Sequence, residues 1–112
     1  MARKVPLPGD RVRGSATGRP IMAALDLAGR RWLLRVLWEL REGPQTFRAL
    51  QARCGAISPT VLNTRLADMR AAGLVEAGSD GYALTALGQG LIEALGPLTR
   101  WAERWARESD RA

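Results

Sequence analysis

The chain has 112 residues, with 17 Lys or Arg against 11 Asp or Glu, a net charge of +6, one cysteine and no histidine. This length predicts one domain with a modest core, and the positive charge permits a polyanionic partner without requiring one. A single cysteine excludes an intrachain disulfide, and the absence of histidine leaves no nitrogen and sulfur ligand cluster for zinc.

Other classes of protein lack support in the sequence. No run of roughly 18 apolar residues is present, so no membrane span is expected, and the N-terminus lacks the apolar region of a signal peptide. A cytoplasmic location is therefore expected. No phosphate-binding glycine loop and no nucleophile with a recognisable base are found, so the chain is not expected to be an enzyme or to carry a metal or cofactor. Lys4 is the only lysine, a bias that fits a GC-rich bacterial genome.

Residues 1–19 form a basic tail. They hold five basic residues and one acid, a net charge of +4, whereas residues 20–112 carry only +2. Several prolines and glycines and no apolar period predict that this tail is disordered or loosely attached, and that residues 20–112 form the domain. Two interpretations stay open for the tail, a passive leader or an arm that contacts DNA.

Two helices are predicted at the start of the domain. The first spans Pro20–Ala28 and is closed by Gly29, and the second spans Arg31–Glu42 and stops at Gly43-Pro44. A helix with apolar groups on two sides, in a chain this short, favours a core on one side and a partner on the other. The second helix has such a pattern, with one stripe of Leu33, Val36, Leu37 and Leu40 and a second of Leu34 and Trp38.

A short third helix is predicted from Thr46, which can cap it, through Arg53. The turn Gly55-Ala56-Ile57 then leads to a helix that begins at Ser58. Two helices joined by a short turn that contains glycine form a helix-turn-helix unit. Cys54 lies next to this turn and is expected to pack as a small apolar residue, since a redox role would need exposure and a lowered pKa.

The helix after this turn carries the strongest local signals. Ser58 is a good N-cap, Pro59 suits the first helical position, and Gly73 suits the left-handed residue that ends a helix. Its inward face is apolar at spacings of four and three: Leu62, Leu66 and Met69. Its outward face is small and hydrogen-bonding: Thr60, Thr64, Ala67 and Ala71. Such a face lets a helix lie in the major groove of DNA, close to the base edges.

A hairpin and a long helical region complete the chain. Leu74–Ala77 and Tyr82–Leu84 are predicted strands around a Gly-Ser-Asp-Gly turn, and Thr85 caps the next helix. Further on, apolar residues at spacings of four, three, four and three resemble a helix-pairing surface: Leu91, Leu95, Leu98, Ala102 and Trp105. Because Pro97 cannot donate to the Glu93 carbonyl, the helix should be kinked or split there.

This order of elements is that of a winged helix, and the residues also resemble the HxlR-type winged helix-turn-helix transcriptional regulators, a group related to the MarR-like regulators. The matching motifs run in order across residues 20–106: Leu25-Asp26, Gly29-Arg30-Arg31-Trp32, Leu37-Trp38-Glu39-Leu40, Gly43-Pro44, Phe47, Leu50, Ile57-Ser58-Pro59, Val61-Leu62, Arg65-Leu66, Gly73-Leu74-Val75, Tyr82-Ala83-Leu84-Thr85, Gly88 and Trp101. The predicted fold is therefore mainly α (α+β), with a two-stranded wing. The resemblance implies a homodimeric regulator that binds double-stranded DNA and dimerises through its first and last helices.

Three positions depart from the family pattern. Members often carry a cysteine before the proline of the first helix, used by some to sense electrophiles or oxidants, but this chain has Arg19 there. Arg30 stands where the family pattern usually has a second glycine. The wing contains Glu76 and Asp80 and no Lys or Arg, which argues against a wing that grips phosphate.

Candidate DNA-binding residues come from the turn before the second helix, the start of the helix-turn-helix and the Ser58 helix. They are Arg30, Arg31, Gln45, Thr46, Arg48, Ser58, Pro59, Thr60, Asn63, Thr64 and Arg65. Hydroxyl and amide groups can bond base edges or phosphates, and the amides of a helix N-terminus attract phosphate. For Arg65 the alternative is an ion pair with Asp68, three residues further on. For the residues between 30 and 48 the alternative is solvated surface.

Candidate dimer contacts are apolar residues of the first, second and last helices: Ile21, Leu25, Leu34, Trp38, Leu91, Leu95, Leu98, Trp101 and Trp105. A homodimer would place two reading helices in successive major grooves, about 34 Å apart, on a pseudo-palindromic operator. Tryptophans at a dimer cleft could hold a planar small-molecule effector, although no motif supports one. The rival hypothesis is a winged-helix module that binds a protein, motivated by the low charge of residues 20–112.

Overall fold

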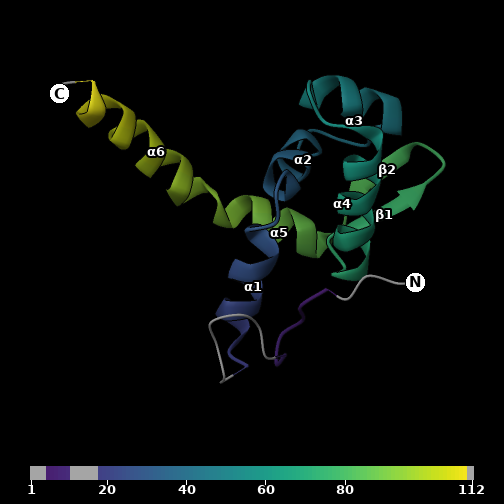
Figure 1. Cartoon of the computed structure of the whole chain (residues 1–112), viewed down its shortest axis with the longest axis horizontal. Coiled ribbons are helices and arrows are strands. Elements are labelled where there is room, and N and C mark those ends of the chain that lie inside the picture. Colours follow the sequence, from purple (N-terminus) through teal and green to yellow (C-terminus); the bar gives the residue numbers. More distant parts are fainter. Residues whose placement is uncertain (1–4, 11–17, 111–112) are drawn as a thin grey trace.

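The computed structural model describes residues 5–10 and 18–110. In chain order its elements are α1 (Pro20–Ala28), α2 (Leu33–Glu39), α3 (Phe47–Cys54), α4 (Pro59–Ala71), β1 (Val75–Gly78), β2 (Gly81–Leu84), α5 (Ala86–Ala94) and α6 (Gly96–Ser109). The predicted class, mainly α with a two-stranded wing, is confirmed. In Figure 1, α2, α3, α4 and the hairpin gather in one body, and α1 and α6 reach away from it. No helix within the described residues is both long and apolar enough to span a lipid bilayer.

The core is built around α2, which packs against α1, α3, α4 and α5. The predicted inward faces of α2 and α4 are confirmed, and their side chains are at most 1% exposed: Leu33, Val36, Leu37, Leu40, Leu62, Leu66 and Met69. The second apolar stripe of α2 is only half-buried. One of its members, Trp38, lies under the guanidinium of Arg41, whose carbon is 4.2 Å from the ring centroid.

The second helix is shorter than predicted at both ends. It spans Leu33–Glu39 rather than Arg31–Glu42, because Trp32 has φ 74° and so cannot belong to a right-handed helix. Bulky residues rarely take this conformation, so it could not be predicted from a tryptophan at this position. At the other end the chain leaves the helix through tight turns, with the Gly43 N–H donating to the Leu40 carbonyl at 3.2 Å.

The predicted helix caps are confirmed. Thr46, Ser58 and Thr85 each accept a hydrogen bond on the side-chain oxygen from the backbone N–H three residues on, at 3.1 Å. Gly73 has φ 81° and ends α4 in the left-handed conformation. The Thr85 hydroxyl also donates to the Gly73 carbonyl at 2.6 Å, which joins the start of α5 to the end of α4.

The wing is a hairpin with a two-residue turn, each strand within one residue of the predicted bounds. Val75 pairs with Leu84 and Gly78 pairs with Gly81. The sequence did not predict a further pairing outside the hairpin, an isolated bridge between Gln45 and Tyr82 with N–H to carbonyl distances of 2.9 and 2.8 Å. The bridge fastens the wing to the segment that leads into α3.

The C-terminal helical region is split where proline predicted it. α5 ends at Ala94 and α6 begins at Gly96, next to Pro97. Figure 1 shows α6 leaving the body as an arm. Every residue from 97 to 109 is exposed, so this arm is not covered by the rest of the described chain.

The part of the basic tail that the structure describes is residues 5–10. Val5 is only 7% exposed and Pro6 is buried, so other parts of the chain cover these two residues, whereas residues 7–9 are exposed. The Asp10 carboxylate accepts a hydrogen bond from the Leu7 N–H at 2.9 Å and closes a short turn. The basic residues expected at positions 3, 4, 11 and 13 lie outside the described residues.

Candidate nucleic-acid interface

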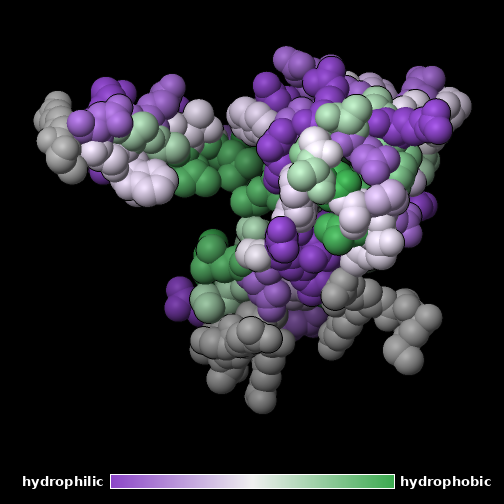
Figure 2. Space-filling view, turned by 45° about the horizontal axis from the view of Figure 1, so that its top comes forward, coloured by the Kyte–Doolittle hydropathy of each residue, from purple (hydrophilic) through white to green (hydrophobic). Residues whose placement is uncertain are grey.

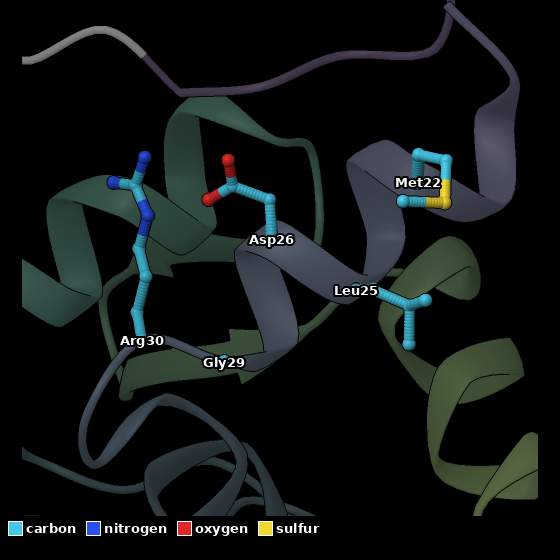
Figure 3. A pocket seen from close by; sticks show the side chains of 5 residues that line it. All are labelled: Met22, Leu25, Asp26, Gly29 and Arg30. Carbon is cyan, nitrogen blue, oxygen red and sulfur yellow. The ribbon is translucent and has the colours of Figure 1, made fainter. Parts of the chain in front are cut away.

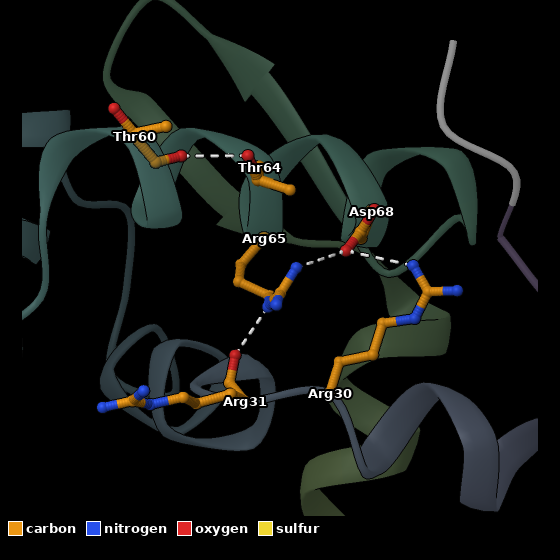
Figure 4. A network of polar contacts seen from close by, with 6 residues as sticks. All are labelled: Arg30, Arg31, Thr60, Thr64, Arg65 and Asp68. Atoms are coloured by element: carbon orange, nitrogen blue, oxygen red, sulfur yellow. Dashed lines mark hydrogen bonds and ion pairs between the residues drawn. The ribbon is translucent and has the colours of Figure 1, made fainter.

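The N-terminal half of α4 presents the predicted reading residues to solvent. Ser58, Pro59, Thr60 and Asn63 are all exposed. Thr64 is half-buried, and its hydroxyl donates to the Thr60 carbonyl at 2.9 Å within the helix (Figure 4). The hydroxyl proton of Thr64 is thus occupied, so the exposed polar groups of this half are those of Ser58, Thr60 and Asn63.

The predicted residues outside α4 differ in exposure. Arg31, Thr46 and Arg48 are exposed, as contacts with phosphate require. Gln45 is half-buried and its backbone is tied to Tyr82 of the wing. In Figure 4 the Arg31 guanidinium points away from the side chains that cluster around α4.

Arg30 and Arg65 are held by an acid instead of facing freely outward. The Arg65 Nη1 lies 3.0 Å from Asp68 Oδ2 and the Arg30 Nη1 lies 3.2 Å from the same oxygen. Their side chains are 15% and 19% exposed, and that of Asp68 is 0% exposed. The Arg65 Nε also donates to the Arg31 carbonyl at 2.5 Å. The alternative foreseen for Arg65, pairing with Asp68, is what the structure shows (Figure 4).

The sequence did not reveal the full role of Asp68. The spacing of three residues from Arg65 predicted one ion pair, but nothing local connects Asp68 with Arg30. A carboxylate exposed on α4 would repel phosphate, but that of Asp68 is only 1% exposed. Its burial between two guanidinium groups makes it part of the packing of α4.

Arg70 is a further basic residue of α4, absent from the predicted set although it shares a flank with Asn63. It is exposed and lines an open groove of about 550 Å³ between the C-terminal half of α4 and β1, together with Ala67, Ala71, Val75, Glu76 and Ala77. The helix side of this groove is mostly alanine, which leaves room beside the helix. Glu76 makes the wing side acidic, in line with the composition of the wing.

The candidate dimer residues include much of the exposed apolar surface. Ile21 and Leu25 of α1 are 55% and 58% exposed, and Leu98, Trp101 and Trp105 of α6 are 51%, 46% and 61% exposed. The two tryptophan rings stack with centroids 5.4 Å apart. The other predicted residues are half-buried: Leu34, Trp38, Leu91 and Leu95. In Figure 2 apolar surface lies on α1 and where α6 leaves the body, on both sides of the recess between these helices.

An open hollow of about 410 Å³ lies beside α1 and is shown in Figure 3. Apolar Met22 and Leu25 line one part of it, and charged Asp26 and Arg30 the other, with Gly29 between. The hollow therefore adjoins both the exposed apolar face of α1 and the cluster around Asp68.

Cys54 packs in the core as predicted. It is 3% exposed, and burial raises the pKa of its thiol above the ordinary value of 9.0, with Arg35 opposing and Glu39 supporting this shift. A protonated, covered thiol is a poor nucleophile.

Known proteins are similar to this chain in sequence and in fold. The family model for the HxlR-like helix-turn-helix matches residues 27–110. YvaP of Bacillus subtilis, described as an uncharacterized HTH-type transcriptional regulator, is 29% identical over 89 residues, which cover 73% of this chain and 82% of YvaP.

Solved structures agree with that match. A possible HxlR family transcriptional factor from Thermoplasma volcanium is 30% identical with TM-score 0.68, covering 75% of this chain and 82% of the other. Quinone-bound YodB from B. subtilis is 27% identical with TM-score 0.72, covering 75% and 96%. A MarR family regulator from Enterococcus faecalis is 27% identical with TM-score 0.73, covering 92% and 100%. Because the family model matches most of this chain, the chain belongs to the HxlR-like helix-turn-helix family of transcriptional regulators.

Proposed function

We propose that this protein is a homodimeric transcriptional regulator that reads the sequence of duplex DNA with α4. The observation that carries the proposal is the exposed, capped start of this helix, where Ser58, Thr60 and Asn63 present hydroxyl and amide groups. These side chains are short, so the helix backbone can come close to base edges in the major groove. The positive end of the helix dipole at this first turn favours a nearby phosphate.

The distribution of charge supports recognition that depends on base contacts more than on general attraction. Residues 20–112 have a net charge of only +2, and Glu76 and Asp80 of the wing are exposed. Two exposed basic residues are the proposed phosphate contacts: Arg48 of α3, and Arg31, whose backbone carbonyl accepts a hydrogen bond from Arg65 of α4. Phosphate contacts set affinity and its salt dependence, whereas base contacts set sequence preference.

The exposed apolar residues of α1 and α6 support dimerisation. Two copies that cover these residues would carry two α4 helices, and successive major grooves on one face of DNA are about 34 Å apart. A two-fold dimer then requires a pseudo-palindromic operator.

Quinones are electrophiles that thiolates attack, and YodB was solved with a quinone bound. Because Cys54 is buried with a raised pKa, we propose no thiol response of that kind for this chain.

Selection of bound DNA from a random duplex pool tests the proposed function. The pool is expected to converge on two inverted half-sites separated by about one helical turn, 10–10.5 base pairs between centres. Weak, salt-sensitive binding without a preferred sequence would instead favour a winged-helix module that binds a protein.

Asn63→Ala tests whether α4 reads bases. We expect the substitution to reduce discrimination between the selected operator and altered operators by about 1–3 kcal/mol, with little change in affinity for random DNA. Fluorescence polarisation on both kinds of DNA measures the two effects. Gln89→Ala, which removes an exposed amide from α5, is the matched control. Equal losses on operator and random DNA would contradict a base-reading role.

A further inference from the structure

α4 contains one charged side chain that is fully withdrawn from solvent. Asp68 is 1% exposed, although an isolated buried carboxylate is strongly unfavourable. Its Oδ2 lies 3.0 Å from Arg65 Nη1 and 3.2 Å from Arg30 Nη1. One partner belongs to α4 itself and the other to the turn between α1 and α2. The burial of Asp68 therefore depends on how α4 sits against that turn.

A second contact ties the same two parts together. Arg65 donates from Nε to the Arg31 backbone carbonyl, so α4 holds both a side chain and a main-chain group of the turn (Figure 4). The turn itself has a defined shape, because Trp32 follows with φ 74° and the Leu33 N–H donates to the Arg30 carbonyl at 3.1 Å. Charge-assisted hydrogen bonds fix geometry more narrowly than apolar contact does.

The turn also continues α1, the helix with Ile21 and Leu25 exposed at 55% and 58%. One side of this short segment thus leads to the candidate dimer face, and the other side contacts the reading helix. A change in the turn would rotate or shift α4 relative to α1. In a dimer that shift would be doubled by the two-fold axis.

We propose that Asp68 is a positioning residue that fixes α4 to the α1–α2 turn through Arg30 and Arg65, and so sets the separation of the two reading helices in the dimer. This inference rests on the proposed DNA-binding function. The experiment that tests it measures the preferred spacing between the two half-sites of the operator. A rigid dimer binds one spacing best, whereas a dimer with loosened helices binds several.

Asp68→Asn, compared with Glu39→Gln, tests the inference. Each substitution removes one carboxylate, keeps the side-chain volume and raises the net charge by one. Glu39 pairs with Arg35 at 3.0 Å on α2 and with Arg53 of α3 at 3.8 Å, away from the Asp68 cluster, so this control also removes a charge that joins two elements. Affinity is measured for the selected operator and for operators with one base pair added or removed between half-sites. We expect Asp68→Asn to lose about threefold to thirtyfold of the preference for the selected spacing, and Glu39→Gln to keep it.

Hydrogen exchange of the free protein gives a second readout that needs no DNA. Asp68→Asn is expected to speed amide exchange in residues 30–33, including the Leu33 N–H, more than Glu39→Gln does. The two variants are compared under conditions in which their free energies of unfolding are equal. If the wild-type protein has no sequence preference, the proposed function fails, but the hydrogen-exchange experiment still tests whether Asp68 holds the α1–α2 turn. Unchanged spacing preference or unchanged exchange in Asp68→Asn would overturn the inference.

Arg30→Gln keeps the inference testable if Asp68→Asn does not fold, since Arg65 still pairs with Asp68 in that variant. Arg35→Gln is its control, because it removes one guanidinium that pairs with Glu39 on α2 and donates to the Arg53 carbonyl of α3, outside the Asp68 cluster. Loss of a phosphate contact would weaken binding at every spacing alike. A selective loss of the spacing preference supports the positioning role, and an equal loss at all spacings overturns it.

Discussion

Single residues of one chemical type have different roles in this protein according to where the fold places them. Arg31 and Arg48 are exposed and available to phosphate, whereas Arg30 and Arg65 surround the buried carboxylate of Asp68. Nothing in their residue type distinguishes these four arginines in the sequence. Their side-chain exposure, which decides whether they can meet DNA, follows from packing between elements.

Cys54 allows a prediction about pH at the residue scale. Because burial raises its pKa above 9.0, the folded state keeps the thiol proton when the unfolded chain has lost it. The stability contributed by the thiol is therefore intact below pH 9.0 and decreases as the pH rises through the raised pKa, by at most about 1.4 kcal/mol per pH unit.

Denaturant unfolding of wild type and Cys54→Ala between pH 7 and 10.5 measures this effect, and other titrating groups cancel in the difference. We expect the stability advantage of wild type to shrink at high pH. An advantage that is constant or grows above pH 9.0 would contradict the assignment.

At the scale of elements, close contacts between backbones decide where small residues are required. A Cβ at Gly88 in α5 would lie 2.1 Å from the Leu74 carbonyl oxygen, whereas a Cβ at Gly90 in the same helix would meet nothing within 4 Å. The same crowding fixes Gly81 of the wing, where a Cβ would lie 2.3 Å from the Gln45 carbonyl oxygen. At these two glycines α5 packs closely against the start of the wing, and the wing packs closely against the segment that leads into α3.

Substitution of the two glycines of α5 should have opposite effects. Gly88→Ala is expected to lower the free energy of unfolding by about 1–3 kcal/mol, because the backbone around Leu74 must move. Gly90→Ala is expected to raise it by about 0.5–1 kcal/mol, since alanine favours an exposed helix. Urea unfolding monitored by circular dichroism measures both, and a stabilising effect of both alanines would contradict the packing described.

At the scale of the whole molecule, the fold separates a packed body from the two helices that reach out of it. α6 is exposed along its length beyond Gly96, yet it carries Leu98, Trp101 and Trp105 on one face. Exposed apolar surface of this kind is typical of a site where another molecule binds. The exposed apolar residues of α1 lie across the recess seen in Figure 2, so a second copy can cover both helices together.

Trp105→Ser is expected to weaken the proposed dimer. Aromatic residues at the centre of an interface commonly contribute about 2 kcal/mol or more, so the dimer Kd should rise roughly thirtyfold. Sedimentation velocity over a range of protein concentrations measures it. Arg107→Gln changes the opposite face of α6 and should leave the dimer intact. A wild-type protein that stays monomeric, or two variants that dimerise equally, would contradict this interface.

The sequence by itself determined the order of elements and most of their ends. Helix caps at Ser58 and Thr85, the left-handed Gly73 and the break at Pro97 act between residues three or four apart, so they can be recognised without knowing the fold. The exposure of the proposed reading residues of α4 was predicted from helical periodicity, which likewise acts within a single helix. About half of the candidate site, its outward face, was accessible in this way.

Tertiary structure decided the features that join distant segments. The pairing of Arg30 with Asp68, the bridge from Gln45 to Tyr82 and the left-handed Trp32 each depend on surfaces that meet only after the chain has folded. Local rules act along one element and cannot specify which side chain of another element will lie opposite. That is why the sequence identified α4 as the candidate DNA-reading helix, while only the packed structure showed which side chains hold it in place.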